Sequence, residues 1–500
     1  MTGLVLGLDQ GTSSTRCVVL DADLCERGSS SVAVASSFPR SGLVEQDPET
    51  IAESAERAIA GALAAARAGR RDVAALGIAN QTETFVVWER ATGRAVHPAI
   101  VWQDRRTDEA CAELRARGHE ELVRRHTGLE LDATFPATKL RWLLEHVGGA
   151  RAAAEEGRLA YGDVAAWLLH RLARVHLTDV GNAGRSLLCS LGELDWDDEL
   201  LELFGIPRAL LPPVVDSDQI DAVAAIGAAR AEVPVRAVAG DQQASLFGLR
   251  CWRSGAAKVT LGTGAFVLAQ AGRAPPRPPA GVLASCAWRR ESTTSYALEG
   301  FIPAAGAALD WFARIGALPA GGDLDALLRS AGTGDPGVVC VPALQGFGSP
   351  TWDAGAHGAL LGLSLGTTRG DLARAVVDGI LHQVADALEA MGDAVTLDAL
   401  WVDGGLSRSD WIVQRLADLA GVRVQRTARS DSTALGAATL AGLAAGVWDR
   451  PEALPEVPLD LVAEPQLVVS RRTGERERWA AARGLTASWR PTWLARGTGG

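Results

Sequence analysis

The stretch LVLGLDQGTSSTRCVVLD, residues 4–21, predicts a strand, a tight polar turn and a second strand. Apolar residues run from Leu4 to Leu8, and a valine-rich run covers Arg16 to Leu20. The small polar residues between these runs leave backbone N–H groups and hydroxyls free to bind an anion. Asp9, at the end of the first strand, could lie beside a phosphate only with a cation between them, which predicts a magnesium-nucleotide site. A polar hairpin turn with a capping aspartate is the structural alternative.

A second hairpin of the same kind occurs in the second half of the chain. AAKVTLGTGAFVLA, residues 256–269, again reads as an apolar strand, a glycine-rich turn and an apolar strand. Two such hairpins predict a duplicated domain whose two phosphate loops face each other. The chain has no Walker A motif and no GxGxxG motif after a strand, so we expect neither a P-loop nor a Rossmann type of nucleotide site.

Length and composition limit the class of protein. Five hundred residues with 47% hydrophobic content exceed what one core organises, which predicts two domains. We expect them at residues 1–248 and 249–490, followed by a tail at 491–500. The net charge is −11 and no basic stripe is present, which argues against nucleic acid and anionic membrane as partners. Lysine is almost absent from the chain.

The cysteines and the apolar runs indicate a cellular location. The seven cysteines show neither CxxC nor metal-ligand spacing, which is typical of reduced core thiols in a cytosolic protein. The N-terminal apolar run is short and ends at Asp9, and no run is long enough to span a membrane. We therefore expect a soluble, cytoplasmic protein.

Polar residues and glycines recur where predicted strands end. Thr82 and Glu83 follow one apolar strand, Asp241 follows another, and glycine loops at 262–264 and 404–405 follow strands of the second half. A kinase acting on a hydroxyl needs a carboxylate base, donors around the phosphoryl group and a cation that neutralises the spreading charge. The strand ends supply residues of each kind.

Several blocks of sequence resemble the FGGY carbohydrate kinases, and among them most closely the glycerol kinases, along essentially the full chain. The second FGGY signature is met by GALLGL at 358–363. The other blocks are GLDQGTSSTR at 7–16, VEQDP at 44–48, NQTETFVVW at 80–88, IVWQDRRT at 100–107, AGDQQASLFG at 239–248, LGTGAF at 261–266 and VDGGLSRSD at 402–410. The resemblance implies an α/β fold of two RNase H-like domains, of the actin and hexokinase type, flanking a central cleft. ATP and Mg²⁺ would bind on one side of the cleft and a polyol on the other.

The resemblance also implies roles for individual residues. Asp241 matches the general base, and Asp9 matches the carboxylate that interacts with magnesium and phosphate. The implied nucleotide-binding residues are Thr12, Ser13, Ser14, Arg16, Thr263, Gly306, Asp310, Gly405 and Ser409. Asp310 and Ser409 stand where glycerol kinases usually have Gln and Asn. The implied substrate-binding residues are Thr82, Glu83, Trp102, Thr134, Asp241, Gln242 and Phe266.

Each implied role has a structural alternative. Asp241 could cap the helix that follows it. Trp102 and Phe266 could belong to the core rather than to a pocket wall. Glu83 could form an ordinary ion pair with Arg105. The glycines at 404–405 could be only a turn into a helix.

Two departures from the glycerol kinase pattern fall within the implied substrate site. Thr82 stands where glycerol kinases have Arg, and Thr134 stands where they have Tyr, so two donors to the glycerol hydroxyls are missing. A charged hydrogen bond contributes about 1.5–3 kcal/mol, so glycerol should bind more weakly by an order of magnitude or more. We expect a longer acceptor, such as a tetritol, a pentitol or a ketose. A true glycerol kinase with an altered pocket is the alternative.

Two other classes of protein are alternatives to a polyol kinase. An actin-like ATPase or chaperone would have no polyol pocket. Gln242 and Trp102 match residues of such a pocket and therefore argue against this class. A non-catalytic sugar sensor should have lost Asp9 or Asp241, and both are present. The expected partners are ATP and a small polyol or sugar, with neither nucleic acid nor membrane, in a homo-oligomer that is a dimer or a tetramer.

Overall fold

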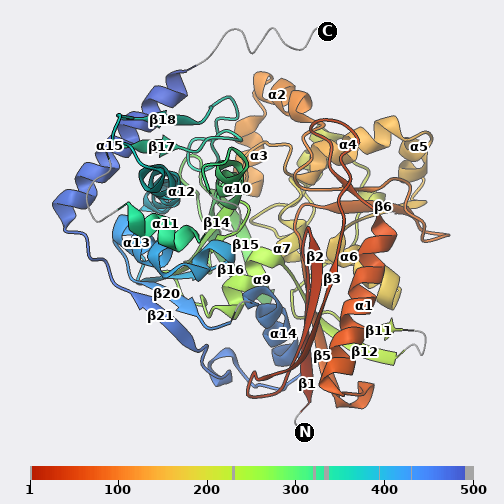
Figure 1. Ribbon diagram of the computed structural model, residues 1–500. Helices are drawn as coiled ribbons and strands as arrows, with labels where there is room; N and C mark the ends of the chain where they lie inside the picture. The colour runs from red at the N-terminus through yellow and green to blue at the C-terminus, as the bar shows by residue number, and fades with distance from the viewer. Residues whose placement is uncertain are drawn as a thin grey trace.

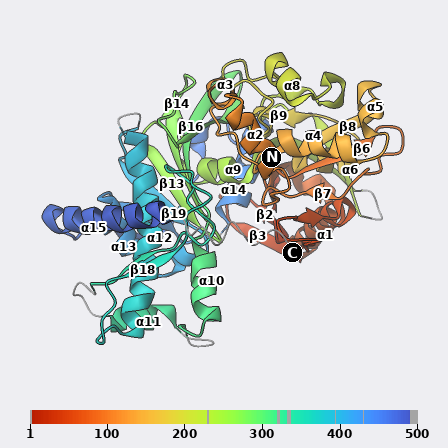
Figure 2. The same cartoon turned by 90° about the horizontal axis from the view of Figure 1, so that it is seen from above.

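The computed structural model describes residues 3–227, 231–318, 323–331, 337–392, 395–429 and 431–489. The tail expected at 491–500 lies outside the described residues. Two α/β halves lie side by side, and each is built on a central mixed sheet (Figures 1 and 2). This arrangement confirms the predicted two-part α/β fold.

The N-terminal half is organised on a six-stranded sheet that contains the N-terminal hairpin. Its strands, in spatial order, are β11 (Ala222–Ile226), β12 (Ala231–Gly240), β5 (Val73–Asn80), β1 (Leu4–Gln10), β2 (Ser14–Leu20) and β3 (Glu26–Ala33). A smaller sheet contains β4 (Glu45–Gln46), β7 (Ala99–Ile100), β6 (Phe85–Glu89) and β8 (Leu159–Asp163), and a short pair is formed by β9 (Thr178–Asp179) and β10 (Val214–Val215). The helices are α1 (Pro48–Ala66), α2 (Asp108–Ala116), α3 (Glu120–Thr127), α4 (Pro136–His146), α5 (Ala150–Glu155), α6 (Val164–Ala173), α7 (Val180–Ala183), α8 (Asp198–Phe204) and α9 (Asp241–Gly248).

The C-terminal half is organised on a seven-stranded sheet. Its strands, in spatial order, are β15 (Leu283–Arg290), β16 (Thr293–Ile302), β14 (Ala265–Gly272), β13 (Ala256–Leu261), β19 (Ala399–Asp403), β20 (Val424–Thr427) and β21 (Leu459–Ala463). A short pair is formed by β17 (Val339–Val341) and β18 (Ala359–Leu361). The helices are α10 (Gly306–Arg314), α11 (Leu324–Ser330), α12 (Arg369–Met391), the 3-10 helix η4 (Gly405–Arg408), α13 (Asp410–Ala420), α14 (Ser432–Ala444) and α15 (Val469–Ser488).

The two large sheets repeat one pattern of strand directions. In the first, β3, β2 and β1 are antiparallel neighbours, β1, β5 and β12 run parallel, and β11 returns antiparallel. In the second, β16, β14 and β13 are antiparallel neighbours, β13, β19 and β20 run parallel, and β21 returns antiparallel. The duplication predicted from the two hairpins is therefore present in the topology.

Helix α1 illustrates how local sequence sets an element. Asp47 accepts a hydrogen bond from the backbone N–H of Glu49, and Pro48 occupies the first turn, where its missing N–H costs nothing. Apolar residues on one face of α1, including Ile51 and Ile59, are fully buried. Asp47 and Pro48 therefore define the start of this helix.

Helix α14 belongs to the second half of the chain but packs on strands β1 and β5 of the first half (Figure 1). The contact is made by backbone, because a Cβ on Gly7 would lie 1.9 Å from the carbonyl oxygen of Ala434. Likewise, a Cβ on Gly77 would lie 1.9 Å from the carbonyl oxygen of Ala437. Glycine is therefore required at both positions, and the two halves share one hydrophobic cluster there.

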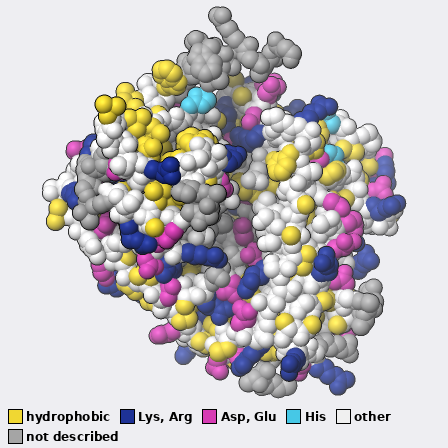
Figure 3. Space-filling model, in the orientation of Figure 1, with side chains coloured by type: hydrophobic (Ala, Val, Ile, Leu, Met, Phe, Trp, Pro, Cys, Tyr) yellow, Lys and Arg dark blue, Asp and Glu magenta, His cyan; other side chains and the backbone are white. Residues whose placement is uncertain are grey.

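Charged side chains of both signs are interspersed over the face of the molecule seen in Figure 3, without a patch of one sign. Among the described residues, no helix combines the length and the apolar character needed to cross a bilayer.

Candidate active site

Parallel strands bring the predicted catalytic residues to one edge of the first sheet. In the register of β1 and β5, Asp9 lies opposite Ala79, and in that of β5 and β12, Asn80 lies opposite Gly240. The three strands therefore end together, and their carboxyl ends carry Asp9, the loop after Asn80, and Asp241. This is the edge at which α/β sheets usually bind ligands.

A cavity of about 270 Å³ lies at this edge and is lined by both halves of the chain. The predicted site residues that line it are Thr12, Ser13, Thr82, Glu83, Trp102, Thr134, Asp241, Gln242, Thr263 and Phe266. Most of the predicted substrate and phosphate positions thus share one cavity.

The remaining predicted nucleotide residues lie outside that cavity. The N–H of Gly306 donates to the carbonyl of Gly262 at 2.9 Å, so the start of α10 is joined to the second phosphate loop. Gly405 lines a separate cavity of about 340 Å³ together with Asp403. Asp310 is exposed on α10.

Three further nucleotide positions have defined partners or environments. The hydroxyl of Ser409 caps α13 and donates to Asp325. Ser14 opens β2, and its carbonyl accepts from the N–H of Gly11 at 2.9 Å. Arg16 lies opposite Asp9 in the hairpin, and its buried Nε has no hydrogen-bond partner among the described residues.

Asp241 has the electrostatic environment expected of a base. Within the described part of the chain, its side chain forms no capping hydrogen bond to α9, and its Oδ1 accepts from the adjacent N–H of Gln242 at 2.8 Å. Removal from water and the neighbouring charge of Glu83 raise the pKa of Asp241 to about 6, while Lys258 opposes the increase. A carboxyl group with this pKa is ionised at neutral pH yet basic enough to accept a proton in a transition state.

Asp9 lies among carboxylates. Removal from water, and then the charge of Asp241, raise the pKa of Asp9 to about 7, with smaller contributions from Asp403 and Asp431. One oxygen of Asp403, Oδ1, is buried without a hydrogen-bond partner. Such an accumulation of negative charge fits a divalent cation.

The cation would have to share its coordination with a nucleotide. The described residues contain no group of three or more His, Cys, Asp or Glu side chains arranged to hold a metal ion. Mg²⁺ usually takes only one or two carboxylates and completes its shell with phosphate oxygens and water. The residues present therefore fit magnesium bound together with a nucleotide.

Glu83 pairs with a residue that sequence reasoning missed. Its Oε1 accepts from Nε of Arg185 at 2.6 Å, and Nη1 of Arg185 donates to Oε2 of Glu299 at 2.6 Å. The expected alternative, a Glu83–Arg105 ion pair, is wrong, because Arg105 pairs with Asp132 instead. Arg185 and Glu299 both line the cavity. The sequence feature that could have indicated them is a single charged residue within each of two apolar segments.

Backbone strain marks the same position. Glu83 has a φ of 63°, a left-handed conformation that costs free energy for a residue with a side chain. The strain and the pairing with Arg185 together fix the direction of its carboxylate.

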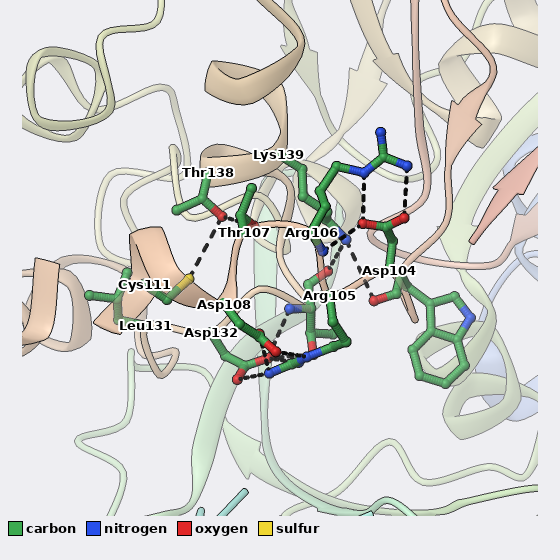
Figure 4. A network of polar contacts seen from close by, with 12 residues as sticks. Asp104, Arg105, Arg106, Thr107, Asp108, Cys111, Leu131, Asp132, Thr138 and Lys139 are labelled. Carbon is green, nitrogen blue, oxygen red and sulfur yellow. Dashed lines mark hydrogen bonds and ion pairs between the residues drawn. The ribbon is translucent and has the colours of Figure 1, made fainter. Parts of the chain in front are cut away.

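The hydroxyl of Thr134 already forms hydrogen bonds within the protein. It donates to Oδ1 of Asp132 at 2.6 Å, and Nη1 of Arg105 approaches it at 3.4 Å. Figure 4 shows Arg105 and Asp132 at the centre of this polar network. Thr134 can therefore accept a hydrogen bond from a ligand but has no proton left to donate.

Aromatic rings form the apolar wall. The ring centroids of Trp102 and Phe266 are 6.3 Å apart, and Phe301 lies 5.0 Å from Phe266 and 6.4 Å from Trp102. The indole N–H of Trp102 donates to the hydroxyl of Thr12 at 3.0 Å. Trp102 and Phe266 are partly exposed to the cavity, so they are not simply core residues.

Comparisons with known proteins agree with this geometry. Residues 4–248 match the N-terminal domain, and residues 257–445 the C-terminal domain, of the FGGY family of carbohydrate kinases. The chain is 44% identical to a glycerol kinase of Aromatoleum aromaticum, over 97% of this chain and 99% of that protein. It is 46% identical to a glycerol kinase of Thermus brockianus, over 88% and 90% of the two chains.

A solved structure shows the same architecture. The crystal structure of Plasmodium falciparum glycerol kinase with ADP matches with a TM-score of 0.90 at 26% identity, covering 97% of this chain and 98% of that one. The chain therefore belongs to the FGGY family of carbohydrate kinases. It is an ATP-dependent phosphotransferase that acts on an alcohol group, and it uses ATP with Mg²⁺.

Proposed function

We propose that the chain phosphorylates a primary hydroxyl of a polyol or ketose longer than glycerol, with Asp241 as the general base. The observation that carries the proposal is one cavity in which Asp241 and Glu83 lie together with threonines at positions 82 and 134. The two short side chains leave room where the glycerol kinase pattern has Arg and Tyr.

Residues that line the cavity can bind the acceptor and remove the proton of its attacking hydroxyl. Glu83 accepts a hydrogen bond from an acceptor hydroxyl, and Asp241 removes the proton of the hydroxyl that attacks. Lys258 donates to Oε1 of Gln242 at 2.6 Å and to Thr260 at 2.7 Å, which fixes the side chain of Gln242 beside the base.

The proposed phosphate end of the cavity contains groups that can stabilise negative charge on a phosphoryl group. Hydroxyls of Thr12 and Ser13 and the backbone of residues 262–264 line it. These groups can donate to the oxygens of the transferred phosphoryl group as its charge spreads. Asp9 would hold magnesium here, and the bound ion would neutralise phosphate charge.

Glycerol is the second candidate acceptor. The curated relatives described above are glycerol kinases, and Arg185 provides a guanidinium inside the cavity although position 82 has none. Both of the bonds described for Arg185 go to carboxylates, however, so it replaces the missing donor only in part.

A screen of ADP release across neutral three- to six-carbon polyols and ketoses tests the proposal. The expected result is that a four- or five-carbon acceptor exceeds glycerol in kcat/KM by an order of magnitude or more. A preference for glycerol over every longer acceptor would favour the second candidate. Release of ADP that no acceptor stimulates would point to an ATPase instead.

We also propose a homo-oligomer, a dimer or a tetramer, acting in the cytoplasm. All seven cysteines are free thiols and six of them are buried, which supports a reducing compartment. Light scattering of the purified chain would give the oligomeric state.

A further inference from the structure

Lysine occurs at only two positions of the chain. Lys and Arg together number 49, and Lys139 and Lys258 are the only lysines among them. Both are completely buried, and both lie beside the cleft. Lys258 supports Gln242 as described above, whereas Lys139 has no part in the chemistry proposed so far.

Lys139 joins two loops that supply pocket residues. It lies on α4, and its ammonium donates to the carbonyl of Thr134 at 2.8 Å and to that of Val101 at 3.2 Å. The carbonyl of Trp102 lies 3.5 Å from the same nitrogen. Lys139 appears in Figure 4 at the upper edge of the polar network. Thr134 and Trp102 both line the cavity, so one nitrogen connects two of its walls.

The nearby charged groups are engaged elsewhere. Asp104, from the loop after β7, pairs with Arg106 and accepts from the N–H of Val44. Asp132, from the loop before α4, pairs with Arg105, and Glu83 pairs with Arg185. Among the described residues, no carboxylate forms an ion pair with Lys139, so the carbonyl oxygens are its hydrogen-bond partners.

An ammonium suits this position better than a guanidinium. It is a compact charge whose three hydrogens can reach three carbonyls around one point, whereas a guanidinium is a planar fork. A chain that uses Arg almost everywhere else thus has Lys where three acceptors converge.

We propose that Lys139 is a positioning residue for the acceptor pocket, which holds the Trp102 and Thr134 loops at the spacing that the acceptor requires. The inference rests on the proposed function, since the acceptor is taken to bind in this cavity. Lys139 acts through the two loops and does not contact the reacting atoms.

The charge state of Lys139 gives the inference a pH signature. Removal from water lowers its pKa to about 8, against the opposing charges of Asp104, Glu83 and Asp132, while Arg105 lowers it further. The group is charged below pH 8 and neutral above it, and a neutral amine has only two hydrogens for three carbonyls. The KM for the acceptor should therefore rise as the pH passes through about 8.

The test compares Lys139→Met and Lys139→Arg with Arg141→Met, which removes a cation from the solvent-facing Arg141–Glu145 pair of the same helix. We expect Lys139→Met to raise the acceptor KM about tenfold or more, because misplaced pocket walls weaken positioning. The kcat and the KM for MgATP should stay within about twofold of wild type. Lys139→Arg should keep its acceptor KM constant between pH 7 and 9, since a guanidinium does not titrate there.

Hydrogen exchange measures the positioning without any substrate. In Lys139→Met, amides of residues 101–106 and 132–135 should exchange faster, while those of the central strands stay unchanged. Unaltered exchange in these loops together with an unaltered acceptor KM would overturn the inference. So would a lower melting temperature with no change in acceptor KM, because that result describes a purely structural lysine. If wild type phosphorylates no polyol, the proposed function fails, and the exchange result alone decides the role of Lys139.

Discussion

Arg185 of the first half donates through Nη1 to Oε2 of Glu299 of the second half at 2.6 Å, and both side chains are buried. The same guanidinium donates through Nε to Glu83. The carboxylate proposed to bind the acceptor and one of the ion pairs that join the two halves therefore depend on one side chain.

Glu299→Gln should destabilise the protein and weaken acceptor binding together. Arg185 keeps Glu83 as a partner, but its buried hydrogen bond to position 299 loses the charge of the acceptor, and a hydrogen bond to a charged group contributes about 1.5–3 kcal/mol. The melting temperature should fall by roughly 2–5 °C. Differential scanning fluorimetry with Glu145→Gln as the control checks this, since that surface pair contributes at most about 1 kcal/mol. Equal melting temperatures for the two variants would contradict the expectation.

Asp241→Asn should keep the shape of the site but remove the base. The kcat should fall by about 10²–10⁴-fold, the usual contribution of general base catalysis. Steady-state ADP release measures it, and calorimetry with MgADP confirms that the nucleotide still binds. A variant with a near wild-type rate would remove Asp241 from this role.

Activity should depend on pH through Asp241. The raised pKa of about 6 means that the carboxylate is ionised above pH 6 and protonated below it. Only the ionised form accepts a proton, so kcat/KM for the acceptor at saturating MgATP, where a bound magnesium would keep Asp9 ionised, should fall roughly tenfold per pH unit below about 6. A pH-rate profile of kcat/KM in constant ionic strength checks this. A fall in kcat/KM centred near pH 4 would mean that the cleft does not raise the pKa of Asp241.

Asp9→Ala should abolish turnover at saturating acceptor while leaving acceptor binding nearly intact. Asp9 is proposed to hold magnesium beside the phosphates, so its loss should remove a magnesium position and not a contact to the carbon chain. Calorimetric titration with acceptor, and separately with MgADP, distinguishes the two subsites. Lost acceptor affinity combined with normal MgADP binding would show that the subsites are reversed.

Thr82→Arg combined with Thr134→Tyr should convert the acceptor preference toward glycerol. The larger side chains fill the space proposed for a longer acceptor and restore donors to the glycerol hydroxyls. The ratio of kcat/KM for glycerol to that for the best longer acceptor should rise by an order of magnitude or more. The two single variants serve as controls, and an unchanged ratio would separate these positions from specificity.

Sequence patterns predicted the elements that carry local signals. Apolar runs around the two polar, glycine-containing turns predicted both hairpins. The strand-end position of Asp241 gave its place in the cleft. These features depend on residues adjacent in sequence, for which short-range sterics and capping decide the structure.

Contacts between distant segments could not be predicted in the same way. Arg185 and Glu299 are each a single charge in an apolar segment, and nothing local indicates that they meet. Lys139 likewise needs three carbonyls whose convergence depends on how two loops fold. The division at residue 248 remains a prediction, and the location of α14 on the first sheet depends on tertiary packing.

Because α14 packs on β1 and β5, the first half of the polypeptide depends on a helix that belongs to the second half. A fragment ending at residue 248 would expose the glycine-lined surface of β1 and β5 to water, since the helix that covers it is encoded in the last quarter of the chain. The N-terminal sheet is therefore covered only after the ribosome has synthesised residues 432–444. Any scheme that splits the gene between the halves must supply both pieces together.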